Sequence, residues 1–229
     1  MRRSLICGLA NVIKACHQRA SVSAMINGSI TTVLFDADGV LQDPVERWRP
    51  AFASRFALAS DRLDILVQSV IATELDYLTR DDGFLEELDL TLQRCNFAGP
   101  SAEVLQILNA IRIDADIVRI VQELSAQGIQ CHLATNQQPH RARHMSEVIG
   151  YRDLFKREFY SCQIGIAKPD VGFFRFILTE LDVPPTSVLF IDDREENVAS
   201  ASEAGLQASL FPAAGGAAAM VTILARFGL

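Results

Sequence analysis

The chain has 229 residues, enough for one full-sized domain or for a core domain with a smaller insertion, but not for two large independent domains. Its 49% hydrophobic and 21% charged residues are typical of an ordinary folded protein, which excludes a disordered or fibrous chain. The net charge of −7 argues against nucleic acid or an anionic membrane as a partner, since neither is attracted to a surface of that sign.

The first thirty residues differ from the rest because they are basic and contain no acidic side chain. Their apolar run from Leu5 to Ile13 is too short to span a bilayer. A targeting segment and an overextended start with Met25 as the true initiator are the two alternatives, and we favour the second. We therefore predict a flexible basic extension over residues 1–30. The basic residues are Arg2, Arg3, Lys14 and Arg19.

The cysteines and histidines do not form a metal or disulfide pattern. The five cysteines are odd in number, widely spaced and never paired as CxxC, so we interpret them as reduced thiols of a cytoplasmic protein. His140 and His144 stand four apart, but they lack an HExxH context and a nearby third ligand, so we interpret them as surface residues. The cysteines are Cys7, Cys16, Cys95, Cys131 and Cys162.

From residue 31 onward, short apolar runs of β type alternate with longer runs of helical periodicity, which predicts a parallel α/β sheet. Continuous apolar runs suit strands that are covered on both faces. Helices are expected at about 114–127, 138–149, 170–182 and 195–204. The expected strands are Thr31 to Phe35, Gln130 to Ala134, Glu158 to Ser161, Val188 to Ile191 and Ala208 to Phe211.

Residues 43–113 interrupt this alternation. Apolar residues recur there at threes and fours without a convincing buried strand, and breaks near residues 60, 82 and 99 divide the segment into the lengths of a four-helix bundle. The segment follows the first strand directly, where open α/β sheets bind ligands, so it is placed to act as a lid. We predict a core of residues 31–42 and 114–229 with a helical cap of residues 43–113.

Polar side chains follow four of the predicted strands. Because the carboxyl ends of parallel strands meet at one edge of a sheet, we expect these side chains to converge on one crevice. Each cluster alone is as easily a turn, a helix cap or a solvated loop, but their joint order favours a functional site. They are Asp36 and Asp38 after the first strand, Thr135 and Asn136 after the second, Lys168 after the third, and Asp192 and Asp193 after the fourth.

The Asp-x-Asp-Gly sequence at residues 36–39 suits phosphoryl transfer. Gly39 allows the sharp turn by which the chain leaves the sheet, so that both carboxylates lie near the crevice. One carboxylate can attack phosphorus to give an acyl phosphate. The other can protonate the leaving oxygen and later deprotonate water.

Four crowded carboxylates repel each other unless a cation neutralises them. Ligands that are all oxygen point to Mg²⁺ when phosphate completes its coordination. Lys168 supplies the cation that an anionic substrate needs, and Pro169 suits position N1 of the following helix. The Thr135 hydroxyl and the Asn136 backbone N–H are expected to donate to a phosphoryl oxygen.

These residues resemble the motifs of the haloacid dehalogenase superfamily, in subfamily I, whose helical C1 cap follows the first motif. The resemblance covers about residues 31–211 and implies a Rossmann-like doubly wound parallel sheet with an inserted helical-bundle cap. The matching segments are Asp36-Ala37-Asp38-Gly39-Val40, Thr135, Lys168-Pro169 and Ile191-Asp192-Asp193.

The resemblance also implies the task of each residue. Asp36 would be the nucleophile, Asp38 the general acid and base, and Thr135 and Lys168 the phosphoryl anchors. Dehalogenases of this superfamily lack the second aspartate of the first motif, so Asp38 argues against dehalogenation. The metal would be held by the Asp36 carboxylate, the Asp38 backbone carbonyl and Asp193, with Asp192 a direct or water-mediated helper.

We therefore expect a magnesium-dependent phosphatase, monomeric or homodimeric, that acts on a small phosphorylated metabolite. A sugar-phosphate mutase of the same fold stays open, because the cap sequence does not reveal the substrate. Arg47, Trp48, Arg49 and Arg55 at the cap entrance are candidate substrate contacts, although such a face is ordinarily solvated. A phospho-acceptor signalling protein would place its acidic pair before the acceptor aspartate, and a non-catalytic phosphate-binding protein would not need the full set of carboxylates.

Overall fold

The structure is a computed structural model that describes residues 29–229. Residues 1–28, and with them most of the predicted extension, Cys7 and Cys16, lie outside the described residues. Five parallel strands form one sheet in the order β5-β4-β1-β6-β7, and each agrees with its predicted range to within one residue at either end. The strands are β1 (Thr32–Phe35), β4 (Gln130–Thr135), β5 (Arg157–Tyr160), β6 (Val188–Asp192) and β7 (Gln207–Leu210).

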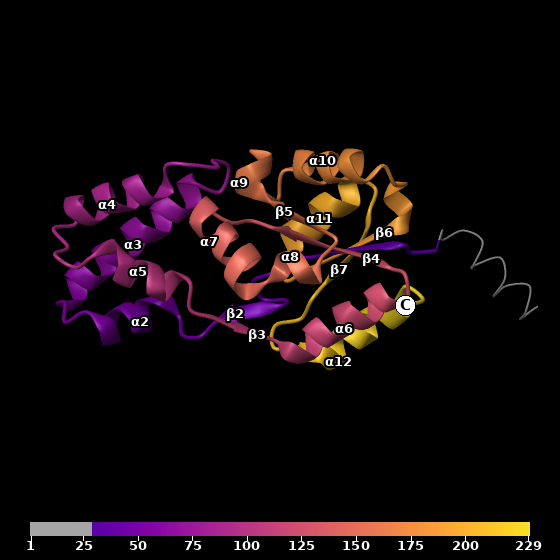
Figure 1. The fold of residues 1–229 in the computed structure, drawn as a ribbon, viewed down its shortest axis with the longest axis horizontal. Helices are drawn as coiled ribbons and strands as arrows, with labels where there is room; N and C mark the ends of the chain where they lie inside the picture. Colours follow the sequence, from indigo (N-terminus) through magenta and orange to yellow (C-terminus); the bar gives the residue numbers. More distant parts are fainter. Residues whose placement is uncertain (1–28) are drawn as a thin grey trace, which may run out of the picture.

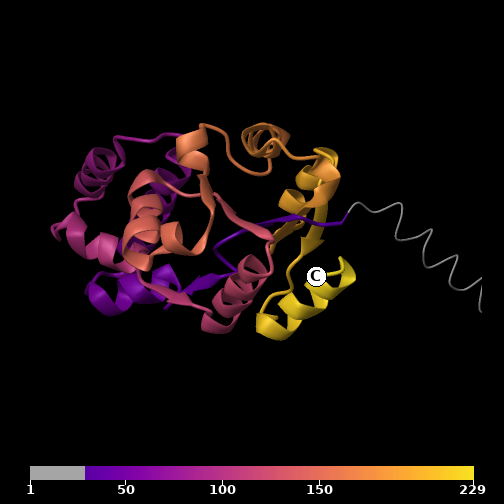
Figure 2. The ribbon, with the colours of Figure 1, turned by 45° about the vertical axis from the view of Figure 1, so that its right-hand side comes forward.

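Helices cover both faces of this sheet, which confirms the predicted doubly wound architecture (Figures 1 and 2). Helices α6 (Ala115–Ala126) and α12 (Gly216–Arg226) lie on one face, and α10 (Val171–Leu181) and α11 (Glu195–Glu203) on the other. No helix within residues 29–229 combines the length and the apolar character needed to cross a membrane. The shorter elements are α7 (Pro139–Arg143), the π-helix η1 (His144–Ile149), α8 (Tyr151–Leu154), α9 (Ser161–Ile164) and the 3₁₀-helix η2 (Pro185–Ser187).

The strand β1 shows how the sheet is buried on both sides. Its successive side chains point to opposite faces, as in any strand. Val33 packs into the cluster that holds Ile117 of α6, whereas Leu34 packs into the cluster that holds Phe174 of α10. Both faces are therefore apolar, which is why the strands read as continuous hydrophobic runs.

Two short strands connect the sheet to a helical insertion, defined as residues 45–110. Strands β2 (Gln42–Pro44) and β3 (Ile111–Ile113) pair antiparallel, with Gln42 opposite Ile113. Neither strand was predicted, because each has only three residues and most of them are not buried, so no apolar run marks them.

The helical insertion contains four helices, with starts at the predicted breaks, around an apolar cluster of its own. Phe52, Leu66 and Leu88 are among the buried residues of that cluster. The division into a cap and a core at residues 43 and 113 stays a prediction. The helices are α2 (Trp48–Arg55), α3 (Ser60–Asp76), α4 (Phe84–Arg94) and α5 (Ser101–Leu108).

Replacing Phe174 with alanine should lower the free energy of unfolding by about 3–5 kcal/mol, the usual cost of removing a buried Phe. Phe174 is fully buried and packs edge-on against Phe190, with ring centroids 4.8 Å apart. Phe176→Ala on the same helix is the control, because its side chain is 38% exposed. Urea unfolding of the two variants checks the prediction, which is wrong if they lose equal stability.

Candidate active site

The parallel register of the sheet brings the predicted site residues to one edge. Phe35 pairs with Leu133 of β4 on one side and with Ile191 of β6 on the other, so the residues that follow these strands emerge together. The Asp36 backbone N–H donates to the Ile191 carbonyl at 2.9 Å. From β1 the chain first adds β4 and β5 on one side of the sheet and then β6 and β7 on the other. The carboxyl end of β1 is therefore the topological switch point of the sheet.

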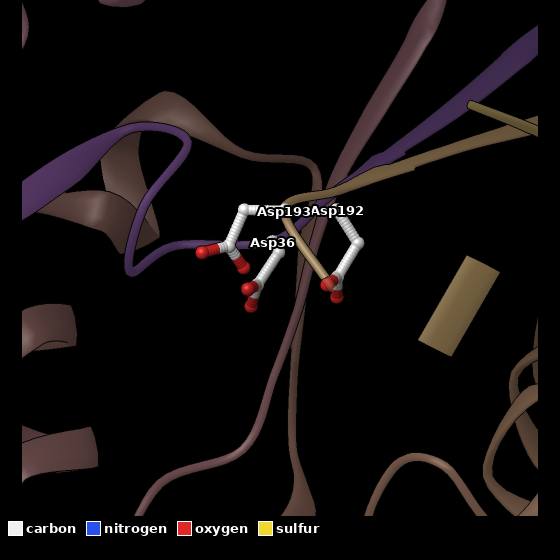
Figure 3. A group of neighbouring side chains, drawn as sticks. All are labelled: Asp36, Asp192 and Asp193. Atoms are coloured by element: carbon white, nitrogen blue, oxygen red, sulfur yellow. The ribbon is translucent and has the colours of Figure 1, made fainter. Parts of the chain in front are cut away.

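Three aspartates gather at this point. Oxygens of Asp36, Asp192 and Asp193 all lie within 4.8 Å of one another (Figure 3). Asp36 comes from the segment that follows β1, and Asp192 and Asp193 from the end of β6. Like charges at this distance favour a cation between them.

Lys168 contacts two of these aspartates. Its Nζ lies 2.9 Å from Asp36 Oδ1, 2.6 Å from Asp192 Oδ2 and 2.9 Å from the Ala134 carbonyl oxygen, and the side chain is buried. Burial by itself lowers the pKa of Lys168, but the two carboxylates outweigh it and raise the pKa above its ordinary value. Lys168 therefore remains charged.

The pKa of the Asp36 carboxyl stays above its ordinary value in spite of Lys168. Burial raises its pKa to about 7; Lys168 opposes this rise, and Asp192 adds to it. Burial and the charge of Asp192 also raise the pKa of Asp193. A further cation beside Asp36 and Asp193 would favour their ionised forms.

Asp192 has little capacity left to bind a metal directly. Oδ2 accepts from Lys168, Oδ1 accepts from the Arg194 backbone N–H at 2.8 Å, and Asn197 Nδ2 lies 3.0 Å from both oxygens. Asp36 and Asp193 are thus the carboxylates with room for an ion, and hard oxygen donors fit Mg²⁺. Asn197 was not predicted, because nothing in the sequence of α11 distinguishes it from Ser200, the other polar residue on the buried side.

Gly39 is required by its backbone and by its neighbour. Its φ of +83° lies in the left-handed region that other residues rarely adopt, and a Cβ built on it would overlap Asp193 Oδ2. The turn after Asp38 and the position of Asp193 therefore both depend on the absence of a side chain at Gly39.

Asp38 is held in a cradle of four hydrogen bonds, defined by Gln42, Gln137 and Arg141. Arg141 binds it in bidentate fashion, Nη1 to Oδ2 at 2.6 Å and Nη2 to Oδ1 at 2.9 Å. Gln137 Nε2 donates to Oδ2 at 2.7 Å and Gln42 Nε2 to Oδ1 at 2.9 Å. Burial raises the pKa of Asp38, but the charge and hydrogen bonds of Arg141 outweigh it and lower the pKa. The sequence reasoning missed this cradle, since no motif joins residues so far apart.

Thr135 and Asn136 lie at the same edge, at the end of β4. Thr135 is buried, with its Oγ1 3.5 Å from Gln137 Nε2. The Asn136 side chain clamps the backbone of Lys168: Nδ2 donates to its carbonyl oxygen at 2.8 Å, and Oδ1 accepts from its N–H at 2.9 Å. Pro169 is not at position N1 as predicted, because the helix begins at Val171 with Asp170 as its N-cap. The phosphate contacts of Thr135, Asn136 and Lys168 stay predictions.

The insertion approaches the site through α3 rather than through its predicted arginines. Glu74 of α3 is buried and accepts from Gln138 Nε2 at 3.0 Å, and burial raises its pKa to about 7. Arg49 instead pairs with Asp64 at 2.6 Å and Arg55 with Glu103 at 3.0 Å. These arginines therefore have partners within the insertion, and Trp48 packs against its apolar cluster.

His140 and His144 lie outside the cluster of potential metal ligands that residues 29–229 form. His140 Nε2 lies 3.0 Å from Asn109 Nδ2, and His144 begins the π-helix η1. Within residues 29–229, the cluster of potential metal ligands is the one at Asp36, Asp192 and Asp193. The cysteines of this part of the chain, Cys95, Cys131 and Cys162, are free thiols.

Fold and site together define an α/β protein with a lysine-neutralised carboxylate centre at the switch point of its parallel sheet. The chain belongs to the haloacid dehalogenase-like hydrolases, since the model of that family matches residues 30–205. This confirms the resemblance of the sequence motifs to that superfamily.

Two curated relatives come from Aspergillus. The chain is 30% identical over 106 residues to the sesquiterpene phosphatase astK of Aspergillus oryzae. The aligned residues make up 46% of this chain and 54% of that protein. It is 41% identical over 58 residues to the drimenol cyclase drtB of Aspergillus calidoustus, and these residues make up 25% of this chain and 11% of that protein. The chain thus spans only about half the length of the first relative and a small part of the second.

Solved structures share the fold. The HAD family enzyme bt-2542 of Bacteroides thetaiotaomicron gives a TM-score of 0.68 over 81% of this chain and 95% of that chain, at 18% identity. The same enzyme in complex with magnesium and inorganic phosphate gives a TM-score of 0.67 over 81% of this chain and 96% of that chain, at 19% identity. A HAD-like family hydrolase of Porphyromonas gingivalis gives 0.67 over 87% and 99%, at 22% identity. At these identities the likeness confirms the fold.

Replacing Gly39 with alanine should lower the affinity for Mg²⁺ as well as the stability of the fold. Any alanine at such a φ costs about 1–2 kcal/mol of stability. At Gly39 the new methyl must also displace Asp193, so we expect Mg²⁺ affinity to fall by about 10-fold or more. Gly128→Ala is the control, because its φ is +90° and its Cβ would meet nothing within 4 Å. Calorimetric Mg²⁺ titration of both variants tests this; equal affinities would contradict it.

Proposed function

We propose that the protein is a magnesium-dependent phosphatase that hydrolyses a small phosphomonoester through an aspartyl-phosphate on Asp36. The observation that carries the proposal is the buried Lys168, bonded to both Asp36 and Asp192, with the Asp193 carboxylate beside them. A carboxylate that must attack an anionic phosphoryl group needs such neutralisation. The family and the sesquiterpene phosphatase relative support this class of reaction.

In the first half-reaction, an oxygen of Asp36 attacks phosphorus and the bond from phosphorus to the substrate oxygen breaks. Lys168, fixed by Asn136 and by Asp192, would bind a phosphoryl oxygen after giving up one of its three present contacts, which are with Asp36, Asp192 and the Ala134 carbonyl. The Thr135 hydroxyl would donate to a second phosphoryl oxygen. In the second half-reaction, water attacks the aspartyl-phosphate and Asp36 is regenerated.

Asp38 is the proposed general acid and base. It would protonate the departing alcohol oxygen and later remove a proton from the attacking water. All four of its hydrogen bonds stabilise the carboxylate form, so proton transfer requires Asp38 to give up at least one of these donors. A dehalogenase would have no use for this second carboxylate, which favours phosphate chemistry.

The carboxylates of Asp36 and Asp193 and the backbone carbonyl of Asp38 would hold Mg²⁺, with Asp192 acting through Lys168 and Asn197. When bound, the ion neutralises charge between the nucleophile and the phosphoryl group. We propose that the helical insertion acts as the cap that excludes water and selects the substrate, since it follows β1 with only the site turn and the short strand β2 between them.

Replacing Asp36 with asparagine should abolish magnesium-dependent release of phosphate from an aryl phosphate, because the amide cannot form the acyl phosphate. We expect a loss of at least about 10⁴-fold in kcat. Asp153→Asn on the surface helix α8 is the control and should keep wild-type activity. Equal activity in Asp36→Asn and wild type would sink the proposal.

A panel of phosphomonoesters should identify the substrate. It should contain sugar phosphates, organic-acid phosphates, a sesquiterpenyl monophosphate and flavin mononucleotide, since a sesquiterpene phosphatase and a flavin mononucleotide hydrolase are among the relatives. We expect magnesium-dependent phosphate release from at least one class. Isomerisation of a sugar phosphate without release would instead establish the mutase.

A further inference from the structure

The segment from Gln137 to Arg141 connects the helical insertion with Asp38. Gln137 and Arg141 bind the Asp38 carboxylate, whereas Gln138 binds Glu74 of α3. His140 in the same segment contacts Asn109, at the end of the insertion. Figure 1 shows α7 at the boundary between the insertion and the sheet. This segment of five residues therefore contacts the insertion with some of its side chains and the proposed general acid with others.

Arg141 is linked to two carboxylates, Asp38 at the edge of the sheet and Glu74 of the insertion. It is only 6% exposed and makes two hydrogen bonds to Asp38. Glu74 is buried and accepts from Gln138 Nε2 at 3.0 Å, while Gln138 Oε1 accepts from the Arg141 backbone N–H at 3.1 Å. One glutamine side chain therefore connects Glu74 with the backbone of Arg141.

We propose that Arg141 is a positioning residue for Asp38, and that Glu74, through Gln138, is the residue by which the helical insertion holds Arg141 in place. This inference rests on the proposed phosphatase function.

The physical reason is a chain of hydrogen bonds from the insertion to Asp38. A bidentate guanidinium fixes the plane and the orientation of a carboxylate, which keeps Asp38 directed toward the site. Glu74 orients Gln138, and Gln138 Oε1 accepts from the Arg141 backbone N–H, so the backbone that carries the guanidinium is fixed as well. Loss of Arg141 disorders the acid directly, and loss of Glu74 loosens the segment that carries Arg141.

The dependence on the leaving group distinguishes positioning from general damage. Phenyl phosphate needs a proton on its leaving oxygen, whereas dinitrophenyl phosphate releases a stable anion and needs none. The ratio kcat/KM reports the steps up to phosphoryl transfer, so a slow second half-reaction does not mask the comparison. A defect in Asp38 should therefore appear with the first substrate and not with the second.

We expect Arg141→Gln to lower kcat/KM for phenyl phosphate by about 10- to 100-fold and to leave that for dinitrophenyl phosphate within about 3-fold. Arg141→Lys keeps the charge but not the bidentate contact, and should give a smaller loss with the same selectivity. It also serves if Arg141→Gln does not fold. Arg143→Gln, exposed on the same helix, is the matched control and should match wild type.

Glu74→Ala tests the second half of the proposal. Because alanine cannot accept from Gln138, we expect a loss of about 3- to 10-fold for phenyl phosphate only, and no further loss when Arg141→Gln is already present. Asp76→Ala, exposed on α3, is its control.

Equal losses of Arg141→Gln on the two substrates would overturn the inference while leaving the phosphatase intact. So would a Glu74→Ala effect that adds fully to that of Arg141→Gln. A wild-type protein that hydrolyses neither substrate would overturn the proposed function and the inference with it.

Discussion

The contact of Lys168 with Asp36 and Asp192 is the interaction on which the rest of the site depends. Two carboxylates at the ends of neighbouring strands would repel each other in a buried setting, and one ammonium group relieves both. The surroundings are arranged around that group: Asn136 fixes the backbone of Lys168, and Asn197 and the Arg194 N–H fix Asp192. Asp36 and Asp193 then remain available for a metal and a substrate.

The order of strands explains how a single lysine reaches two carboxylates. Because β1 lies in the centre with β4 on one side and β6 on the other, the three segments that follow them are adjacent without any long loop. Lys168 comes from the segment after α9 and reaches across this edge. The site is thus a product of parallel pairing, since its aspartates lie at or next to rigid strand ends.

The sequence was sufficient to predict most of this arrangement. Each strand of the main sheet is a continuous apolar run, so its end and the polar residues after it are visible without a structure. The ribbon β2–β3 was not predictable, because three mostly unburied residues give no periodic signal. Arg141, Gln137 and Asn197 were missed for a different reason: their importance comes from contacts with Asp38 and Asp192 that only the folded chain creates.

The same ribbon has a consequence for how such a protein can change its specificity. The chain enters and leaves the helical insertion side by side, and the Val45 N–H donates to the Ala110 carbonyl at 2.8 Å. A segment whose two ends already meet can be exchanged, lengthened or shortened without displacing the strands at its base. With the proposed role of the insertion, substrate preference can therefore diverge by replacement of this module without displacing Lys168 and the carboxylates.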